Sequence, residues 1–195
     1  NGIPNSRLTR LYCEFDQRVH IMAKYLRHIL KQSGLLRGDQ GCLNSYSIIL
    51  MVIAFLQKQE KPILPNLHEG GNGKEYTFYA THQNKWKRTN IKTVKYALNE
   101  DLQKVKDEFN FDNKKTVAEL VVEFLVDIFL TDKITGRSKI DIAKGGYSDG
   151  PTDQYSLIDI VEPFSSDARV GQGCRKDSHH PQAYTRFAYN FLTNV

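Results

Sequence analysis

The sequence is poor in cysteine. Its three cysteines, Cys13, Cys42 and Cys174, are odd in number and lie far apart among 195 residues. Such spacing argues against a secreted disulfide framework and favours a reducing compartment. Cys174 lies near His179 and His180, but no second cysteine pair lies nearby, so zinc-ligand spacing is absent and no metal site is expected there.

The sequence also lacks a long apolar run, since the longest extends only from Ile48 to Leu56. A membrane-spanning helix needs roughly 20 apolar residues, so this run predicts a buried core helix and no membrane partner. Asn1 opens no signal-peptide pattern and is not an initiator methionine, which leads us to expect that the chain begins inside a longer polypeptide. Internal repeats and low-complexity tracts are absent, and one domain is the default for this length.

What the sequence does have is positive charge, with 27 Lys and Arg against 22 Asp and Glu, a formal net charge of +5. This balance favours a polyanionic partner, nucleic acid or nucleotide, although a modest excess of lysine is common on inert surfaces. The segment from Tyr76 to Lys95 mixes aromatic residues with cations around the single tryptophan, Trp86, a composition that suits a nucleic-acid contact. The alternative is a solvated basic helix with Trp86 buried, which we favour slightly because no repeated aromatic spacing supports a stacking platform.

From Asp16 to Ser33 the apolar residues recur at helical spacing, and Gly34 is the natural end of this helix. This spacing leaves Lys24, Arg27 and Lys31 clustered along another stripe. Like charges at this spacing cost only about 0.2 to 0.5 kcal/mol per pair, so a solvated face explains the stripe as well as a ligand does.

The next helix is expected to start after the polar turn at Gly41 and Cys42. A helix start presents N–H groups without intrahelical partners and the positive end of the helix dipole, which makes it suited to an anion. Ser45 could therefore hold a phosphate, and Tyr46 offers a ring face to a base.

Four further elements are predicted. A turn around Pro4 leads into a short helix capped by Asn5 or Ser6. Thr116 and Glu119 form a capping box for a helix that extends to Leu130. Its apolar positions are expected to face the core: Leu120, Val121, Phe124, Leu125, Ile128 and Phe129. Its acidic stripe, Glu119, Glu123 and Asp127, is expected to be a solvated face. A turn-rich loop over 145–153 is followed by a strand over 155–161, and the last helix is expected over about 181–192.

Taken together, these pieces resemble the template-independent RNA nucleotidyltransferases, the group of terminal uridylyltransferases and cytoplasmic poly(A) polymerases in the DNA-polymerase-β-like superfamily. Four ordered segments carry the resemblance: Gly2 to Ser6 before Leu8 and Tyr12, Asp16 to Val19, Gly41 to Gln57 with Ile63 to Leu67, and Ile160 to Phe164. The resemblance implies a fold that is mostly α with a small β component (α+β), the helical central domain of such an enzyme. Residues 1–15 would join it to an upstream catalytic domain, and 16–195 would form the nucleotide-binding domain, with the poly(A)-polymerase-associated region at about 116–170.

The resemblance also implies roles for single residues. Asn5 matches the family residue that contacts ribose and base, and Ser6 stands where a threonine is usual. Arg27, at a position usually occupied by lysine, joins Lys31 and Ser45 as contacts of the triphosphate. Tyr46 matches the ring that stacks on the base.

The base-discriminating segment departs from the uridylyl pattern. Glu162 replaces an aspartate, Ser165 stands at a second acidic position, and Ala168 stands where a histidine contacts the base. The loss of those polar groups weakens selection of uracil. In contrast, the spacing of Val170 to Gly173 and the basic pair Arg175 and Lys176 is closer to that of the longer uridylyltransferases than to that of the poly(A) enzymes. The choice between UTP and ATP as substrate stays open. Contacts with RNA are expected at Lys87, Arg88 and Arg169.

The family's reaction is attack of an RNA 3′-hydroxyl on the α-phosphate, with two Mg²⁺ (or Mn²⁺) ions held by carboxylates of the upstream domain. We assign no catalytic residue and no metal ligand to this chain. The expected activity is addition of uridylyl or adenylyl residues to an RNA 3′ end by the longer protein, with an RNA-binding protein as a possible partner. The alternative is a catalytically inactive module that serves as an RNA- or protein-binding platform. The cytoplasm is the expected location, with nucleus and mitochondrion as alternatives.

Overall fold

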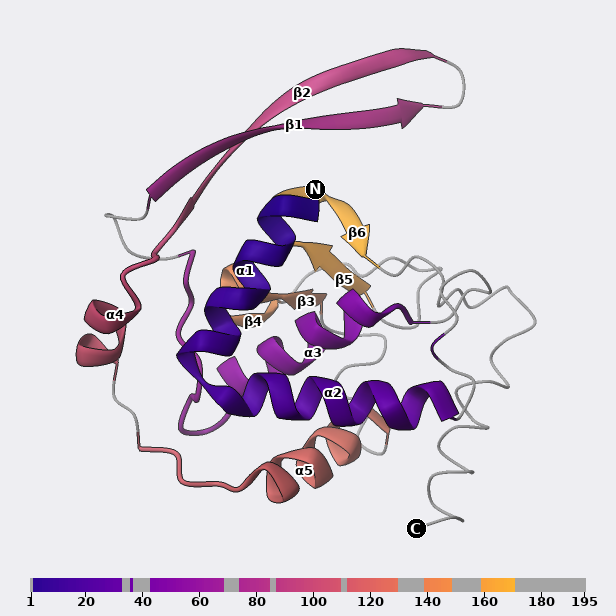
Figure 1. Cartoon of the computed structure of the whole chain (residues 1–195). Coiled ribbons are helices and arrows are strands. Elements are labelled where there is room, and N and C mark those ends of the chain that lie inside the picture. Colours follow the sequence, from indigo (N-terminus) through magenta and orange to yellow (C-terminus); the bar gives the residue numbers. More distant parts are fainter. Residues whose placement is uncertain are drawn as a thin grey trace.

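The computed structural model describes residues 2–32, 36, 43–68, 74–84, 87–109, 112–129, 139–148 and 159–170. Within these ranges the helices are α1 (Gly2–Phe15), α2 (Gln17–Gln32), α3 (Ser45–Gln57), α4 (Leu102–Glu108) and α5 (Val117–Phe129). The strands are β1 (Lys74–Asn84), β2 (Lys87–Leu98), β3 (Lys139–Asp141), β4 (Gly146–Ser148), β5 (Asp159–Glu162) and β6 (Ser165–Val170). The expected α+β class is confirmed (Figure 1).

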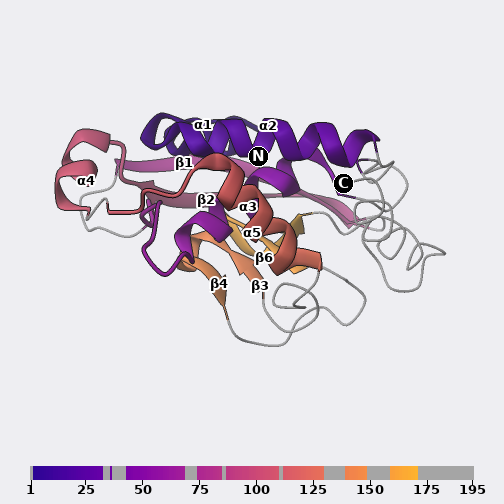
Figure 2. The ribbon, with the colours of Figure 1, turned by 90° about the horizontal axis from the view of Figure 1, so that it is seen from below.

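The helices and the small sheet form layers, with α3 in the middle. Seen from below, α1 and α2 lie on one side of α3 and strands β3 and β4 lie on the other (Figure 2). This position explains the apolar composition of α3, because ten of its 13 residues are buried. The predicted core helix is confirmed. No helix within the described ranges has the length and apolarity that a bilayer crossing requires.

The sheet has the strand order β4-β3-β5-β6, with β3 parallel to β5 and the other pairs antiparallel. Between β3 and β4 the chain turns through Ile142–Lys144 and Gly145, whose φ of 78° is left-handed. The expected loop over 145–153 was therefore wrong for Gly146–Ser148, which pair with β3 in a three-residue strand. Of the expected strand over 155–161, the structure describes Asp159 onward, and residues 155–158 lie outside the described ranges.

Helix α1 begins earlier than expected. Pro4 lies in the first turn of this helix. A backbone N–H at this position would have no intrahelical acceptor, so proline, which lacks the N–H, costs the helix no hydrogen bond. Asn5 and Ser6 are consequently inside the helix, and the expected turn with one of them as cap was wrong. Asp16 separates α1 from α2, and Gly34, the expected end of α2, lies outside the described residues.

The corner between α1 and α2 is held by Arg18. Its backbone N–H donates to Asp16 Oδ1 at 2.8 Å, and its guanidinium donates to Asp16 Oδ2 at 2.8 Å. The same guanidinium donates to the carbonyl oxygens of Asn113 and Lys115 at 3.0 and 3.1 Å. One side chain thus ties the start of α2 to the segment that leads into α5.

Helix α5 begins with the predicted capping box. The N–H and hydroxyl of Thr116 donate to Glu119 Oε2 at 2.7 and 2.8 Å, and the Glu119 N–H donates to Thr116 Oγ1 at 3.3 Å. Four of the apolar positions predicted to face the core are buried: Leu120, Val121, Phe124 and Leu125. Glu123 of the acidic stripe pairs with Lys115 at 2.8 Å.

The segment from Tyr76 to Lys95 is a β-hairpin, so the basic helix that we favoured there was wrong. Strands β1 and β2 pair antiparallel, with Tyr76 opposite Tyr96 and Phe78 opposite Val94. The physical reason is composition, since β-branched and aromatic residues are enriched in strands and lose rotamer freedom in helices. Trp86 and the helix expected over 181–192 lie outside the described residues.

Candidate nucleotide-binding site

The start of α3 is capped by Asn44. Its side-chain oxygen accepts from the Ser47 N–H at 2.8 Å and from the Ser47 hydroxyl at 3.1 Å. The cap therefore satisfies the third N–H of the helix and leaves those of Ser45 and Tyr46 for another acceptor, as far as the described residues show. Sequence reasoning missed Asn44, although asparagine directly before an apolar helix is a preferred N-cap.

Three elements that are far apart in sequence bring their side chains together beside this helix start. Asn5 of α1 hydrogen-bonds to the carboxylate of Glu162, which ends β5, and that carboxylate also acts on the phenol of Tyr46 in α3. The sheet thus closes against α1 and α3 at the point where three of the expected nucleotide-binding residues meet.

The titration of this cluster reflects its burial. Burial raises the pKa of the Glu162 carboxyl, an effect that the hydrogen bond from Asn5 opposes. Burial also raises the pKa of the Tyr46 phenol, and the nearby charge of Glu162 raises it further. At neutral pH the phenol is therefore a neutral, half-buried ring with one polar edge.

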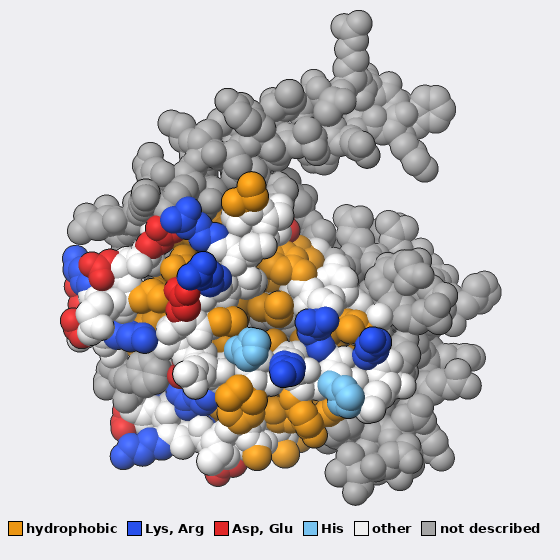
Figure 3. All heavy atoms as spheres, viewed as in Figure 1, with side chains coloured by type: hydrophobic (Ala, Val, Ile, Leu, Met, Phe, Trp, Pro, Cys, Tyr) orange, Lys and Arg blue, Asp and Glu red, His pale blue; other side chains and the backbone are white. Residues whose placement is uncertain are grey.

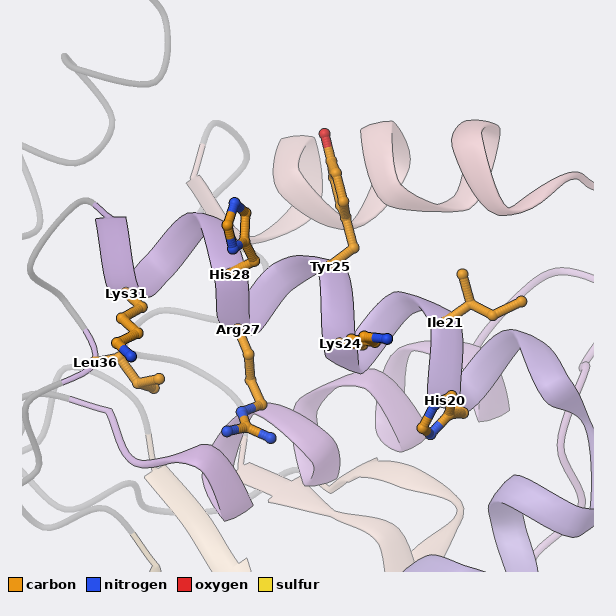
Figure 4. Close-up of a pocket in the computed structure, with 8 residues that line it drawn as sticks. All are labelled: His20, Ile21, Lys24, Tyr25, Arg27, His28, Lys31 and Leu36. Carbon is orange, nitrogen blue, oxygen red and sulfur yellow. The ribbon is translucent and has the colours of Figure 1, made fainter.

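Helix α2 supplies positive charge on its exposed face. Figure 3 shows Lys, Arg and His side chains gathered over this helix, with hydrophobic side chains beside them. They line an open pocket of about 700 Å³, formed by His20, Ile21, Lys24, Tyr25, Arg27, His28, Lys31 and Leu36. In Figure 4, Arg27 extends from α2 toward the side on which α3 lies, whereas Tyr25 and His28 project from the other side. Lys31 extends from α2 on the same side as Arg27 in this view, so both cations lie toward the α3 side.

No family model matches the chain. Among curated proteins, it is 27% identical to the poly(A) RNA polymerase gld-2 of Caenorhabditis elegans over 147 residues, 74% of this chain and 12% of that protein. It is 34% identical to terminal uridylyltransferase 4 of Homo sapiens over 71 residues, 36% of this chain and 4% of that protein. These two matches show which group of proteins the chain is related to. The chain is related to the template-independent RNA nucleotidyltransferases.

Solved structures of such nucleotidyltransferases share the fold. The complex of mtPAP with UTP superposes with a TM-score of 0.71 at 20% identity, over 97% of this chain and 36% of that one. Cid1 with the UTP analogue UMPNPP gives a TM-score of 0.71 at 19% identity, over 94% of this chain and 54% of that one. The chain thus spans about a third to a half of these solved nucleotidyltransferases and a small part of the curated ones.

Not every residue expected from the nucleotidyltransferase resemblance joins the cluster. Ser6 is exposed and lines a separate pocket with Arg7, Arg10 and Glu100, on another side of α1 from Asn5. Ala168 and Arg169 belong to β6, where Arg169 is the register partner of Val161. Lys87 and Arg88 open β2 in the hairpin, outside the cluster.

Within the described residues, no three His, Cys, Asp or Glu side chains are grouped so that they could hold an ion. Among these carboxylates, Glu100 forms an ion pair with Arg7, whose Nη2 lies 2.9 Å from Glu100 Oε2.

Proposed function

We propose that this chain is the nucleotide-binding central domain of a template-independent RNA 3′-terminal nucleotidyltransferase. The observation that carries the proposal is the meeting of Asn5, Tyr46 and Glu162 beside the start of α3. These residues come from three separate elements, and a fold that served packing alone would have no reason to bury a carboxylate there. The kinship with poly(A) and uridylyl enzymes supports the same conclusion.

In this proposal each group has a role that its chemistry suits. The unshared N–H groups at the start of α3, with the Ser45 hydroxyl, bind the terminal phosphates of the nucleotide. Arg27 and Lys31 add positive charge from α2, Arg27 with a planar fork that can grip two phosphate oxygens. Tyr46 offers its ring to the base, and Asn5 donates to the ribose or base edge.

The same proposal places Ser6 near the sugar only by resemblance, because its side chain lies on another side of α1. Glu162, Ala168 and the strand around them would face the base edge. An ionised carboxylate only accepts hydrogen bonds, so Glu162 reads donors on the base. Catalysis, with Mg²⁺ or Mn²⁺ ligands, is left to another part of the parent protein.

The first test is binding of UTP and ATP to the chain, measured by titration calorimetry. Tyr46→Leu keeps an apolar side chain in the half-buried position and removes the ring, so it should weaken binding roughly tenfold, the size of a lost base stack. Lys31→Ala should weaken it because a phosphate contact is lost, whereas Lys104→Ala, a charge change on α4, is the matched control. Equal affinity of Tyr46→Leu, Lys31→Ala and the parent chain would refute the site.

Base choice has its own test. Ala168→His restores a polar group at the position where uridylyl enzymes carry histidine, and it should raise the ratio of UTP to ATP affinity. The control is Arg169→His, which puts the same side chain one residue along β6. A ratio unchanged by Ala168→His would exclude position 168 from base recognition.

Transferase activity is tested on the full-length parent protein. Extension of a labelled RNA with Mg²⁺ and each of the four nucleoside triphosphates would establish the enzyme and name its substrate. Absence of extension with every nucleotide would favour the alternative, an inactive module that binds RNA or protein. We extend the proposal to a cytoplasmic location and an RNA-binding protein partner, which immunofluorescence and affinity purification of the parent protein would test.

A further inference from the structure

The large hydrophobic side chains that remain exposed are gathered on two helices. Among the described residues they are Ile3, Ile21, Tyr25, Val122 and Val126, with exposed fractions from 37% to 84%. Ile3 belongs to α1, whereas the other four belong to α2 and α5. Helices α2 and α5 pack side by side, so these four side chains share one surface of the molecule (Figure 1).

Helical spacing arranges these side chains in two rows. Ile21 and Tyr25 are four residues apart, as are Val122 and Val126, and residues at this spacing lie on the same face of a helix. Ala118 is also exposed and extends the row of valines by one turn. In Figure 4, Tyr25 projects from α2 to the side on which α5 lies. Figure 3 shows hydrophobic side chains gathered beside the Lys and His row of α2. We call these five residues the apolar ledge.

The ledge is separate from the faces with which the two helices pack into the core. Leu26 of α2 and Phe124 of α5 are buried on those inner faces. A helix that packs on one side only normally carries polar residues on the other. An exposed apolar patch with charged residues at its rim is typical of an interaction surface.

The two edges of the ledge carry opposite charge. Helix α2 contains four Lys and Arg and no carboxylate, whereas α5 contains three carboxylates and no Lys or Arg. On the α2 edge, Lys24 forms no ion pair within the described residues. On the α5 edge, Glu123 pairs with Lys115, yet its side chain is still 40% exposed. The charge of Asp127 acts on the Tyr147 phenol of β4, so the acidic edge lies on the sheet side, away from α2.

This arrangement makes the ledge complementary to itself. A two-fold axis that runs along the helices would place α2 of each copy against α5 of the other. The apolar rows would then bury each other, and Lys24 of each copy would meet Glu123 of the other copy. A two-fold axis across the helices would instead oppose α2 to α2 and bring like charges together.

We propose that the apolar ledge is the contact between two copies of this chain. An acidic peptide would match the α2 edge alone, whereas a second copy matches both edges at once. The ledge is small, so the dimer should be weak, with a dissociation constant on the order of 10 µM. Arg27 and Lys31 extend to the α3 side, so the dimer leaves the candidate nucleotide site open and the inference does not rest on the proposed function.

The first test is sedimentation velocity of the chain, at concentrations from about tenfold below to tenfold above that dissociation constant. The double variant Tyr25→Ser with Val122→Ser removes an apolar anchor from each row, so dimerisation should weaken on the order of tenfold or more. The matched control is Ile3→Ser, which changes the exposed hydrophobic residue of α1 and should leave the dimer unchanged. Unfolding by urea verifies that each variant remains folded.

The second test exchanges the charges of the two edges. Lys24→Glu and Glu123→Lys each place like charges opposite one another, so each variant alone should be monomeric. An equimolar mixture of the two restores both charge pairs in a heterodimer and should dimerise like the parent chain. Urea unfolding is again needed, because Glu123→Lys also removes the ion pair with Lys115.

Three outcomes would overturn the proposal. A chain that is monomeric at every concentration excludes a second copy and leaves the ledge to a partner of another sequence. A dimer that responds equally to Ile3→Ser and to the ledge variant lies on another surface. A mixture of the charge variants that dimerises no better than its components refutes the pairing of α2 with α5. Weakening by the ledge variant alone, with recovery in the mixture, supports the proposal.

Discussion

The hairpin of β1 and β2, which we call the ribbon, and the rest of the described chain, which we call the body, are built on different principles. In the body, α3 is surrounded by α1, α2 and the sheet, and burial of apolar side chains determines where each element lies. In the ribbon, two strands pair chiefly with each other, and register determines which residues share a face. The difference teaches that changes in the body should have large effects on stability and changes on the ribbon small ones.

The largest effect is expected where the sheet meets α3. Gly146 has a φ of 111°, and a Cβ there would lie 2.7 Å from the Ala54 carbonyl oxygen and 2.8 Å from Lys58 Cγ. Gly146→Ala should therefore lower the free energy of unfolding by about 3 kcal/mol or more, from overpacking and backbone strain together. Urea unfolding of the chain measures this.

Gly145→Ala is the matched control, because its φ of 78° is also left-handed but nothing lies within 4 Å of the added Cβ. It should cost about 1 kcal/mol, the conformational part alone. Equal costs at the two positions would mean that the sheet does not pack against α3 as closely as described.

The next effect concerns acid stability at the root of the ribbon. His68 packs near Phe164 with ring centroids 5.7 Å apart, both its nitrogens lack partners in the described residues, and burial lowers its pKa to about 4. An unfolded histidine titrates near 6.5, so below that pH the unfolded state binds more protons and stability falls until about pH 4. The loss is on the order of 3 kcal/mol.

His68→Phe keeps a ring against Phe164 and removes the titration. Unfolding free energies at pH 7.5 and 4.5 should differ less in this variant than in the parent chain. Since all other groups are common to both proteins, an identical pH dependence would show that His68 titrates normally and is not buried.

A smaller effect is expected at the start of α5. Thr116→Ala removes the hydroxyl that caps the Glu119 N–H and donates to the Glu119 carboxylate, so unfolding should become easier by about 1 kcal/mol. Thr116→Ser keeps the hydroxyl and should restore most of that stability. Failure of serine to do so would assign the loss to packing of the threonine methyl group.

The smallest effect on stability is expected in the ribbon. Lys92→Gln should shift the unfolding free energy by less than about 0.5 kcal/mol, as most surface substitutions do. A large fall in the unfolding free energy of Lys92→Gln would contradict the expectation that the ribbon contributes little to stability.

Several local features could be predicted from sequence because their causes are local. The capping box of Thr116 and Glu119 and the amphipathic pattern of α2 depend on residues within one or two turns. The start of α1 was misplaced because Pro4 suits both a turn and a first helical turn. Ser45 and Tyr46 were singled out by the expected helix start, whereas Asn5 and Glu162 were expected only by resemblance, and the roles of all four stay predictions.

The sequence by itself determined the buried helix α3, the capping box of α5 and the excess of positive charge. Only the tertiary structure decided that Asn5, Tyr46 and Glu162 meet, because α1, α3 and β5 contribute one residue each and no local rule relates them. The tertiary structure also decided that Tyr76, Phe78 and Tyr96 share a face. Strand pairing is a contact between distant residues, and one residue of slip would have moved every side chain to the other face.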